Sequence, residues 1–168
     1  MEQRIGESMS EIERIVDEFR RGHEQGAWHG PSVREGLAGV SASAAASHPI
    51  PGAHSIWELV LHITGWRGEA IRRLEGSEPG TPPEGDWPPV GDTSEAAWAD
   101  ALRRLDDSYR RLAGAVLSFA ERRLDDKVGR EPPDPSLGTV GSYYVMLHGI
   151  AQHDAYHMGQ VAILRKLI

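Results

Sequence analysis

Residues 141–168, GSYYVMLHGIAQHDAYHMGQVAILRKLI, decide the fold of this chain. Apolar side chains recur there every three or four residues, which predicts a helix with one face against a core. The predicted face consists of Tyr143, Met146, Ile150, His153, His157, Val161, Leu164 and Ile168. Two central members of this face are therefore histidines that lie four residues apart.

The spacing of His153 and His157 suggests a metal site. Side chains four residues apart stack on one helix face, with Cβ atoms about 5–6 Å apart. Two imidazoles so placed can bind one ion through bonds of roughly 2.0–2.1 Å. The alternative is a pair of hydrogen-bonded core histidines, and the spacing alone leaves both interpretations open.

Three further amphipathic segments precede this helix. The first spans residues 8–21, and its apolar face carries Met9, Ile12, Val16 and Phe19. The second begins at Ser55, which forms a capping box with Glu58, and its face carries Leu59, His62, Ile63, Trp66 and Ala70. The third begins at Asp92, with Glu95 three residues later. Its seam is heptad-like and consists of Trp98, Leu102, Leu105, Tyr109, Leu112, Val116 and Phe119.

The connections between these segments are rich in glycine and proline. The longest, residues 23–54, is expected to hold one short helix around 32–37. Residues 76–93 contain too much proline for a helix and are expected to form a loop anchored by Trp87. A similar loop is predicted at about 125–138.

These patterns predict an all-α fold. No stretch alternates with a period of two for long enough to indicate a strand. Four amphipathic helices, with a long irregular connection between the first and the second, are typical of a four-helix bundle. At 168 residues, we expect residues 1–168 to form a single domain.

Composition excludes several functions. The net charge of −7 and the pI near 5.6 argue against a protein that binds nucleic acid through its phosphates. There is no cysteine, which excludes disulfides, thiolate nucleophiles and cysteine-bound zinc. No apolar run approaches membrane-spanning length and the N-terminus has no apolar signal core, so we expect a cytoplasmic protein that does not bind membranes.

His62, His153 and His157 are all predicted to point into the bundle core. Three protein ligands with one position left open are typical of catalytic metal sites. An all-imidazole set suits zinc, nickel, copper or iron. A di-iron centre would need inward Glu residues that are absent here. The segment 153–157, HDAYH, approaches the zincin motif, but its Asp is one methylene shorter than the Glu of that motif.

The chain resembles the DinB/YfiT-like superfamily of metal-binding four-helix bundles. The similarity lies in HSIWELVLHITGW (54–66) and MLHGIAQHDAYHMGQVAILRK (146–166), with weaker support from AWHGPSV (27–33). This resemblance implies that His62, His153 and His157 bind one divalent ion. Nickel or zinc is the expected metal, with iron or manganese as alternatives, and a homodimer is expected. Relatives include bacillithiol transferases and mycothiol-dependent isomerases.

Other residues are candidates for the surroundings of the metal. Gln160 is expected either to hydrogen-bond a ligand imidazole or to lie as a polar residue at the edge of the apolar face. We expect a pocket at one end of the bundle, bounded by Trp66, Tyr156 and the loop that carries Trp28 and His29. The alternative for this loop is that Trp28 closes one end of the core while His29 is solvated.

The favoured function is a metal-dependent enzyme that transfers a low-molecular-weight thiol to a small electrophile. A metal ion lowers the pKa of a bound thiol or water, so thiol transfer needs little more from the protein. A metal-dependent hydrolase is the first alternative, although no general base stands out in the sequence. The second alternative is a metal-stabilised bundle that binds a small molecule without turnover.

Overall fold

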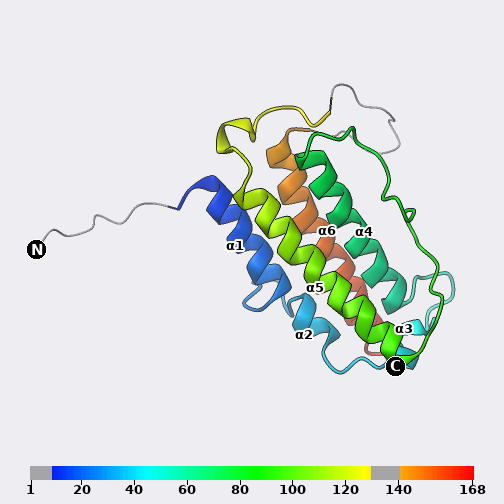
Figure 1. Ribbon diagram of the computed structural model, residues 1–168. Helices are drawn as coiled ribbons and strands as arrows, with labels where there is room; N and C mark the ends of the chain where they lie inside the picture. The colour runs from blue at the N-terminus through cyan, green and yellow to red at the C-terminus, as the bar shows by residue number, and fades with distance from the viewer. Residues whose placement is uncertain (1–8, 130–140) are drawn as a thin grey trace, which may run out of the picture.

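Four long helices pack side by side in the computed structural model, which describes residues 9–129 and 141–168 (Figure 1). The elements are α1 (Glu11–His23), α2 (Val33–Leu37), α3 (Ala42–Ala46), α4 (Ile56–Leu74), α5 (Glu95–Leu117), the 3-10 helix η1 (Glu121–Arg123) and α6 (Tyr143–Leu164). The bundle consists of α1, α4, α5 and α6. No strand occurs within the two described ranges, so the predicted all-α four-helix bundle is confirmed. None of the described helices is long and apolar enough to cross a membrane.

A serine precedes each of the α-helices and accepts a hydrogen bond from the backbone at its third position. Such caps satisfy a backbone N–H that the helix itself leaves unpaired. The cap of α5 is Ser94, so the predicted start at Asp92 was wrong. Asp92 instead accepts hydrogen bonds from the backbone and the hydroxyl of Ser94, which orients the cap. Helix α1 begins after Ser10 and ends at His23, two residues beyond the predicted end.

The connection between α1 and α4 contains two short helices, where the sequence predicted one. The expected helix is α2, and the second, α3, lies in the alanine- and serine-rich run. Its Ala42 and Ala45 are buried, because small side chains let this turn pack closely against α4 and α5. Helix α1 has only 13 residues against 19 in α4, so α2 continues the layer that α1 begins (Figure 1).

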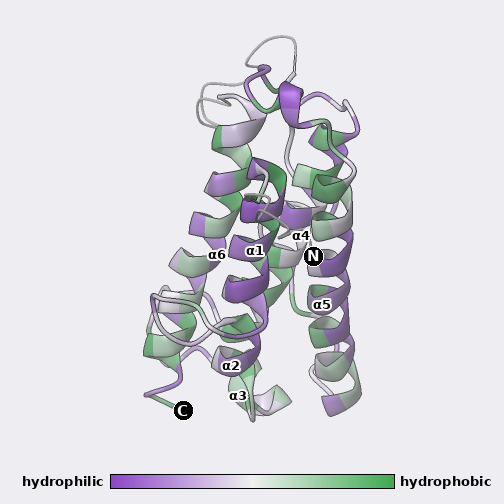
Figure 2. Ribbon diagram, turned by 90° about the vertical axis from the view of Figure 1, so that its left-hand side faces the viewer, coloured by the Kyte–Doolittle hydropathy of each residue, from purple (hydrophilic) through white to green (hydrophobic). Residues whose placement is uncertain are grey.

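Two apolar clusters form the core. One joins α1 to the C-terminal halves of α4 and α5 and the start of α6. The other joins α2 and α3 to the N-terminal halves of α4 and α5 and the end of α6. Hydrophilic residues cover the outward face of α1 (Figure 2). A polar layer of buried side chains separates the clusters along the helices and comprises His23, His62, Arg67, Ser108, Asp154 and His157.

The buried face of α6 differs in part from the predicted one. Leu147 and Met158 are buried although neither was assigned to the face, whereas Ile168 lies beyond the helix and is 48% exposed. Val145 and Ile163 are exposed on the outside of the same helix. Apolar residues thus occur all round α6, and their spacing alone did not fix which side is buried. The predicted loop at 125–138 lies largely outside the described residues, which end at 129 and resume at 141.

Candidate metal centre

The three candidate histidines lie near the middle of α4 and α6. Helix α4 begins with the predicted capping box, in which Glu58 N donates to Ser55 Oγ (3.2 Å) and Ser55 N donates to Glu58 Oε2 (2.7 Å). Counting from this fixed start, His62 lies two turns into the helix and points toward α6. His153 and His157 follow each other by one turn on α6, so they meet His62 from one side.

The Nε2 atoms of the three imidazoles converge. His153 Nε2 lies 2.9 Å from His62 Nε2 and 3.1 Å from His157 Nε2. All ligand atoms of this group lie within 4.8 Å of one another. Two nitrogens that bind one ion through bonds of roughly 2.0–2.1 Å are about 3.3 Å apart at a tetrahedral angle. The spacing of the imidazoles therefore fits a single transition-metal ion.

The other ring nitrogens fix where the protons lie. His62 Nδ1 donates to the backbone oxygen of Asp86 (2.7 Å), and His157 Nδ1 donates to Gln160 Oε1 (2.8 Å). Because both acceptors are oxygens, each neutral ring carries its proton on Nδ1 and presents a lone pair at Nε2. Both lone pairs face His153, whose single proton cannot point along both contacts. A cation among the three Nε2 atoms resolves this conflict.

Burial keeps these rings in the form that binds metal. It lowers the pKa of His62, and it lowers the pKa of His157 to about 4. Both imidazoles are therefore neutral at pH 7, as metal ligands must be. The hydrogen bond to Gln160 opposes the effect of burial on His157 without cancelling it.

A family model described as the DinB superfamily matches residues 28–161, a range that includes all three histidines. The chain belongs to the DinB superfamily. This result confirms the resemblance inferred from the sequence motifs. No curated protein and no solved structure matches the chain. In this DinB protein, three histidines are grouped closely enough that they could hold a metal ion.

Trp87 forms a wall of the site that the sequence did not assign to it. Its ring stacks on His62 (centroids 3.9 Å apart) and on His54 (3.5 Å), so it lies between the two imidazoles. Trp87 thus anchors the 76–93 loop, as expected, and it does so by packing on the rings of His62 and His54. The neighbouring Asp86 accepts the indole N–H of Trp66 through Oδ1 (2.8 Å) and accepts His62 Nδ1 through its backbone oxygen.

A buried carboxylate fastens this loop to α4. Glu69 is 0% exposed, and its Oε1 accepts from the backbone N–H of Gly80 (2.9 Å) and from Arg73 Nε (3.0 Å). Arg73 Nη2 in turn donates to the backbone oxygen of Gly80 (2.8 Å). Sequence reasoning missed this contribution, because a Glu and an Arg four residues apart resemble an ordinary surface pair.

Of the four predicted pocket residues, two lie beside the histidines. The Trp66 ring is 6.3 Å from the His153 ring, and the Tyr156 ring is 5.0 Å from the His157 ring. Tyr156 is 66% exposed. The side chain of His153 is 26% exposed against 6% for His62, so solvent reaches the site from the His153 side.

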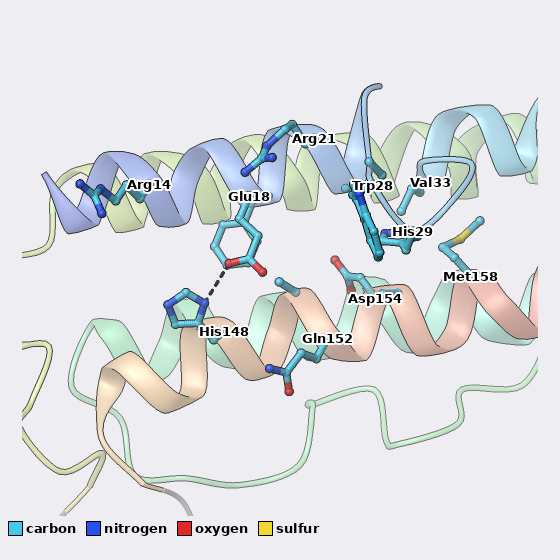
Figure 3. A pocket seen from close by; sticks show the side chains of 15 residues that line it. Arg14, Glu18, Arg21, Trp28, His29, Val33, His148, Gln152, Asp154 and Met158 are labelled. Carbon is cyan, nitrogen blue, oxygen red and sulfur yellow. Dashed lines mark hydrogen bonds and ion pairs between the residues drawn. The ribbon is translucent and has the colours of Figure 1, made fainter. Parts of the chain in front are cut away.

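Trp28 and His29 lie in a different place. Both line a cavity of about 470 Å³ between α1 and α6, which none of the three candidate ligands lines (Figure 3). Trp28 is 96% exposed, so the alternative that it closes the core was also wrong. His148, which was left out of the predicted site, lines the same cavity and contacts Glu18 through Nδ1 (2.8 Å). The site was predicted at one end of the bundle, and this prediction was wrong. Helices α2 and α3 supply a second apolar cluster between the histidines and that end.

Proposed function

We propose that this DinB protein is a divalent-metal-dependent enzyme that joins a low-molecular-weight thiol to a small electrophile. The observation that supports it is the convergence of the three Nε2 atoms beside a solvent-exposed edge of His153. The residues that would hold the ion are His62, His153 and His157, and zinc or nickel is the proposed metal, with iron or manganese as alternatives. An ion held there would act as a Lewis acid and lower the pKa of a thiol that reaches it.

The positions of the carboxylates favour thiol transfer over hydrolysis. Within the part of the chain that the structure describes, Asp86 and Asp154 are the acidic groups that contact the ligand rings, and both lie on the Nδ1 side, away from the converging Nε2 atoms. Neither is therefore placed to move a proton to or from a water that attacks an ester or amide. A thiol needs only to lose its proton, since its unperturbed pKa of about 8.5 is already near neutrality.

Aromatic side chains supply the proposed substrate surface. Trp66 and Trp87 contact the histidine rings, and the exposed Tyr156 lies beside them. Such surfaces suit the apolar body of a small electrophile. In the proposed reaction the thiol releases its proton to solvent, a bond forms between sulfur and the electrophilic carbon, and the leaving group departs from that carbon.

A turnover screen tests this proposal. Metal-free protein is reloaded with zinc or nickel, mixed with glutathione-like or bacillithiol-like thiols and a chlorinated electrophile, and thioether formation is followed. We expect a rate that depends on the metal and that His153→Ala abolishes. His148→Ala is the matched control, because His148 lies on the same helix and contacts Glu18 instead of the site. If no thiol reacts in a metal-dependent way, small-molecule binding without turnover becomes the better account.

A further inference from the structure

Asp154 follows His153 in α6 and carries a buried oxygen that lacks a partner. Its Oδ2 accepts two hydrogen bonds from Arg67, from Nε (3.0 Å) and Nη2 (2.7 Å). Its Oδ1 is shielded from solvent and accepts no hydrogen bond. A buried carboxylate oxygen without a donor costs stability, so a donor close to Oδ1 would stabilise this arrangement.

The nearest candidate donor is the adjacent ligand. His153 Nδ1 is also buried without a partner, and it lies 3.9 Å from Asp154 Oδ1. The Nδ1 atoms of His62 and His157 each donate to an oxygen, so His153 is the one ligand whose Nδ1 lacks an acceptor. The two unpaired atoms are less than about 1 Å beyond hydrogen-bond distance, a gap that small side-chain rotations close.

We infer that Asp154 is a positioning residue for the metal centre, because its Oδ1 accepts the Nδ1 proton of His153. This hydrogen bond holds the imidazole in the tautomer whose Nε2 lone pair faces the other two rings. All three ligands then donate through Nδ1 to an oxygen: a backbone carbonyl, an amide and a carboxylate. Such contacts on the far side of ligand histidines orient the rings and raise their basicity.

Arg67 holds the Asp154 carboxylate in place for this role. The other three N–H groups of its guanidinium contact Leu105 O (3.3 Å), Ser108 Oγ (3.4 Å) and His23 Nδ1 (3.3 Å). With both bonds to Asp154, all five donors of Arg67 are used. Figure 3 shows Asp154 projecting from α6 toward α1, on a wall of the cavity between these helices. The carboxylate is thus held at Oδ2 by Arg67, whose other partners do not contact the metal ligands.

Zinc affinity provides the test. Untagged, metal-free protein competes with a chromophoric chelator for zinc, and Asp154→Asn should weaken binding by about 10- to 100-fold. The amide keeps the size of the side chain but removes the negative charge that the His153 proton faces. Ser108→Ala is the matched control, since it removes a contact to Arg67 in the same buried layer. If Asp154→Asn binds zinc within about twofold of Ser108→Ala, the inference is overturned.

A second measurement needs no variant and decides the question even if Asp154→Asn does not fold. In zinc-loaded wild-type protein, the Nδ1 proton of His153 should give a downfield NMR resonance that exchanges slowly with water. Exchange as fast as that of a free imidazole would show that no acceptor holds it. The inference rests on the metal site of the proposed function but not on thiol transfer. Tight zinc binding without turnover therefore leaves it intact, whereas a wild-type protein that binds no zinc overturns both.

Discussion

Two polar clusters share the buried middle layer of the bundle, and they differ in how far the protein itself satisfies them. Around Arg67, all five N–H donors find an acceptor in Asp154, Ser108, Leu105 or His23. His23 extends this hydrogen-bond network, because its Nε2 donates to Asp106 (2.8 Å). Every donor of the Arg67 guanidinium is thus matched within the chain.

In the histidine cluster, the lone pairs of the Nε2 atoms are not all paired with a protein donor. Two Nε2 lone pairs face His153 at 2.9 and 3.1 Å, and no protein group in the described residues donates a proton to each of them. Buried polar groups are nearly always paired, so such an exception is typical of a ligand-binding site. The first cluster therefore stabilises the fold, while the second could hold a cation.

The largest effect is expected from breaking the Arg67 cluster. Arg67→Met leaves Asp154 buried without its counter-charge, which typically costs about 3–5 kcal/mol of unfolding free energy. Burial opposes the ionisation of Asp154, but Arg67 and His153 together outweigh it and hold the pKa of Asp154 below its ordinary value. Urea denaturation measures the loss. Arg104→Met is the control, because the Arg104 side chain is 70% exposed and should change stability by at most about 0.5 kcal/mol. Equal small losses in both variants would contradict the comparison.

A smaller effect, shared by the two clusters, should appear with pH in the metal-free protein. Burial lowers the pKa of His23, in the Arg67 cluster, and of His157, in the histidine cluster, to about 4 each. Between about pH 4 and 6.5 the unfolded chain therefore binds more protons than the folded one. The free energy of unfolding should have its full value above about pH 6.5 and fall as the pH drops toward 4.

Urea titrations at several pH values between 4.5 and 7 measure this slope. His23→Gln removes the contribution of one cluster, so its slope should be clearly shallower than that of the wild type. A stability that stays constant over this range would show that neither histidine is held neutral by burial.

Much of the fold was predictable from local patterns. The heptad-like seam of α5 and the capping box at Ser55 identified their helices correctly. Helix α3 was missed because Ala–Ser repeats are equally common in loops, and only contact with α4 and α5 decides the outcome. The exposure of Trp28 depends on the path of a loop, which local periodicity does not specify.

The site was predictable only where its residues lie on helices. His62, His153 and His157 could be brought together because helical spacing places each on a known face. Trp87 enters the site through a proline-rich loop whose path depends on the distant Glu69–Gly80 contact. The Arg67–Asp154 pair joins two helices at a separation of 87 residues, and no local pattern signals it.

The most direct test of the central claim is a zinc titration of the untagged, metal-free protein by calorimetry, with elemental analysis of the loaded product. We expect about one ion per chain for the wild type and for His148→Ala, and none held by His62→Ala. The comparison is well matched, because both substitutions remove an imidazole but only His62 belongs to the convergent group. A wild-type protein that binds no zinc, or a His62→Ala variant that binds it as tightly as His148→Ala, would contradict the assignment of the three histidines as a metal centre.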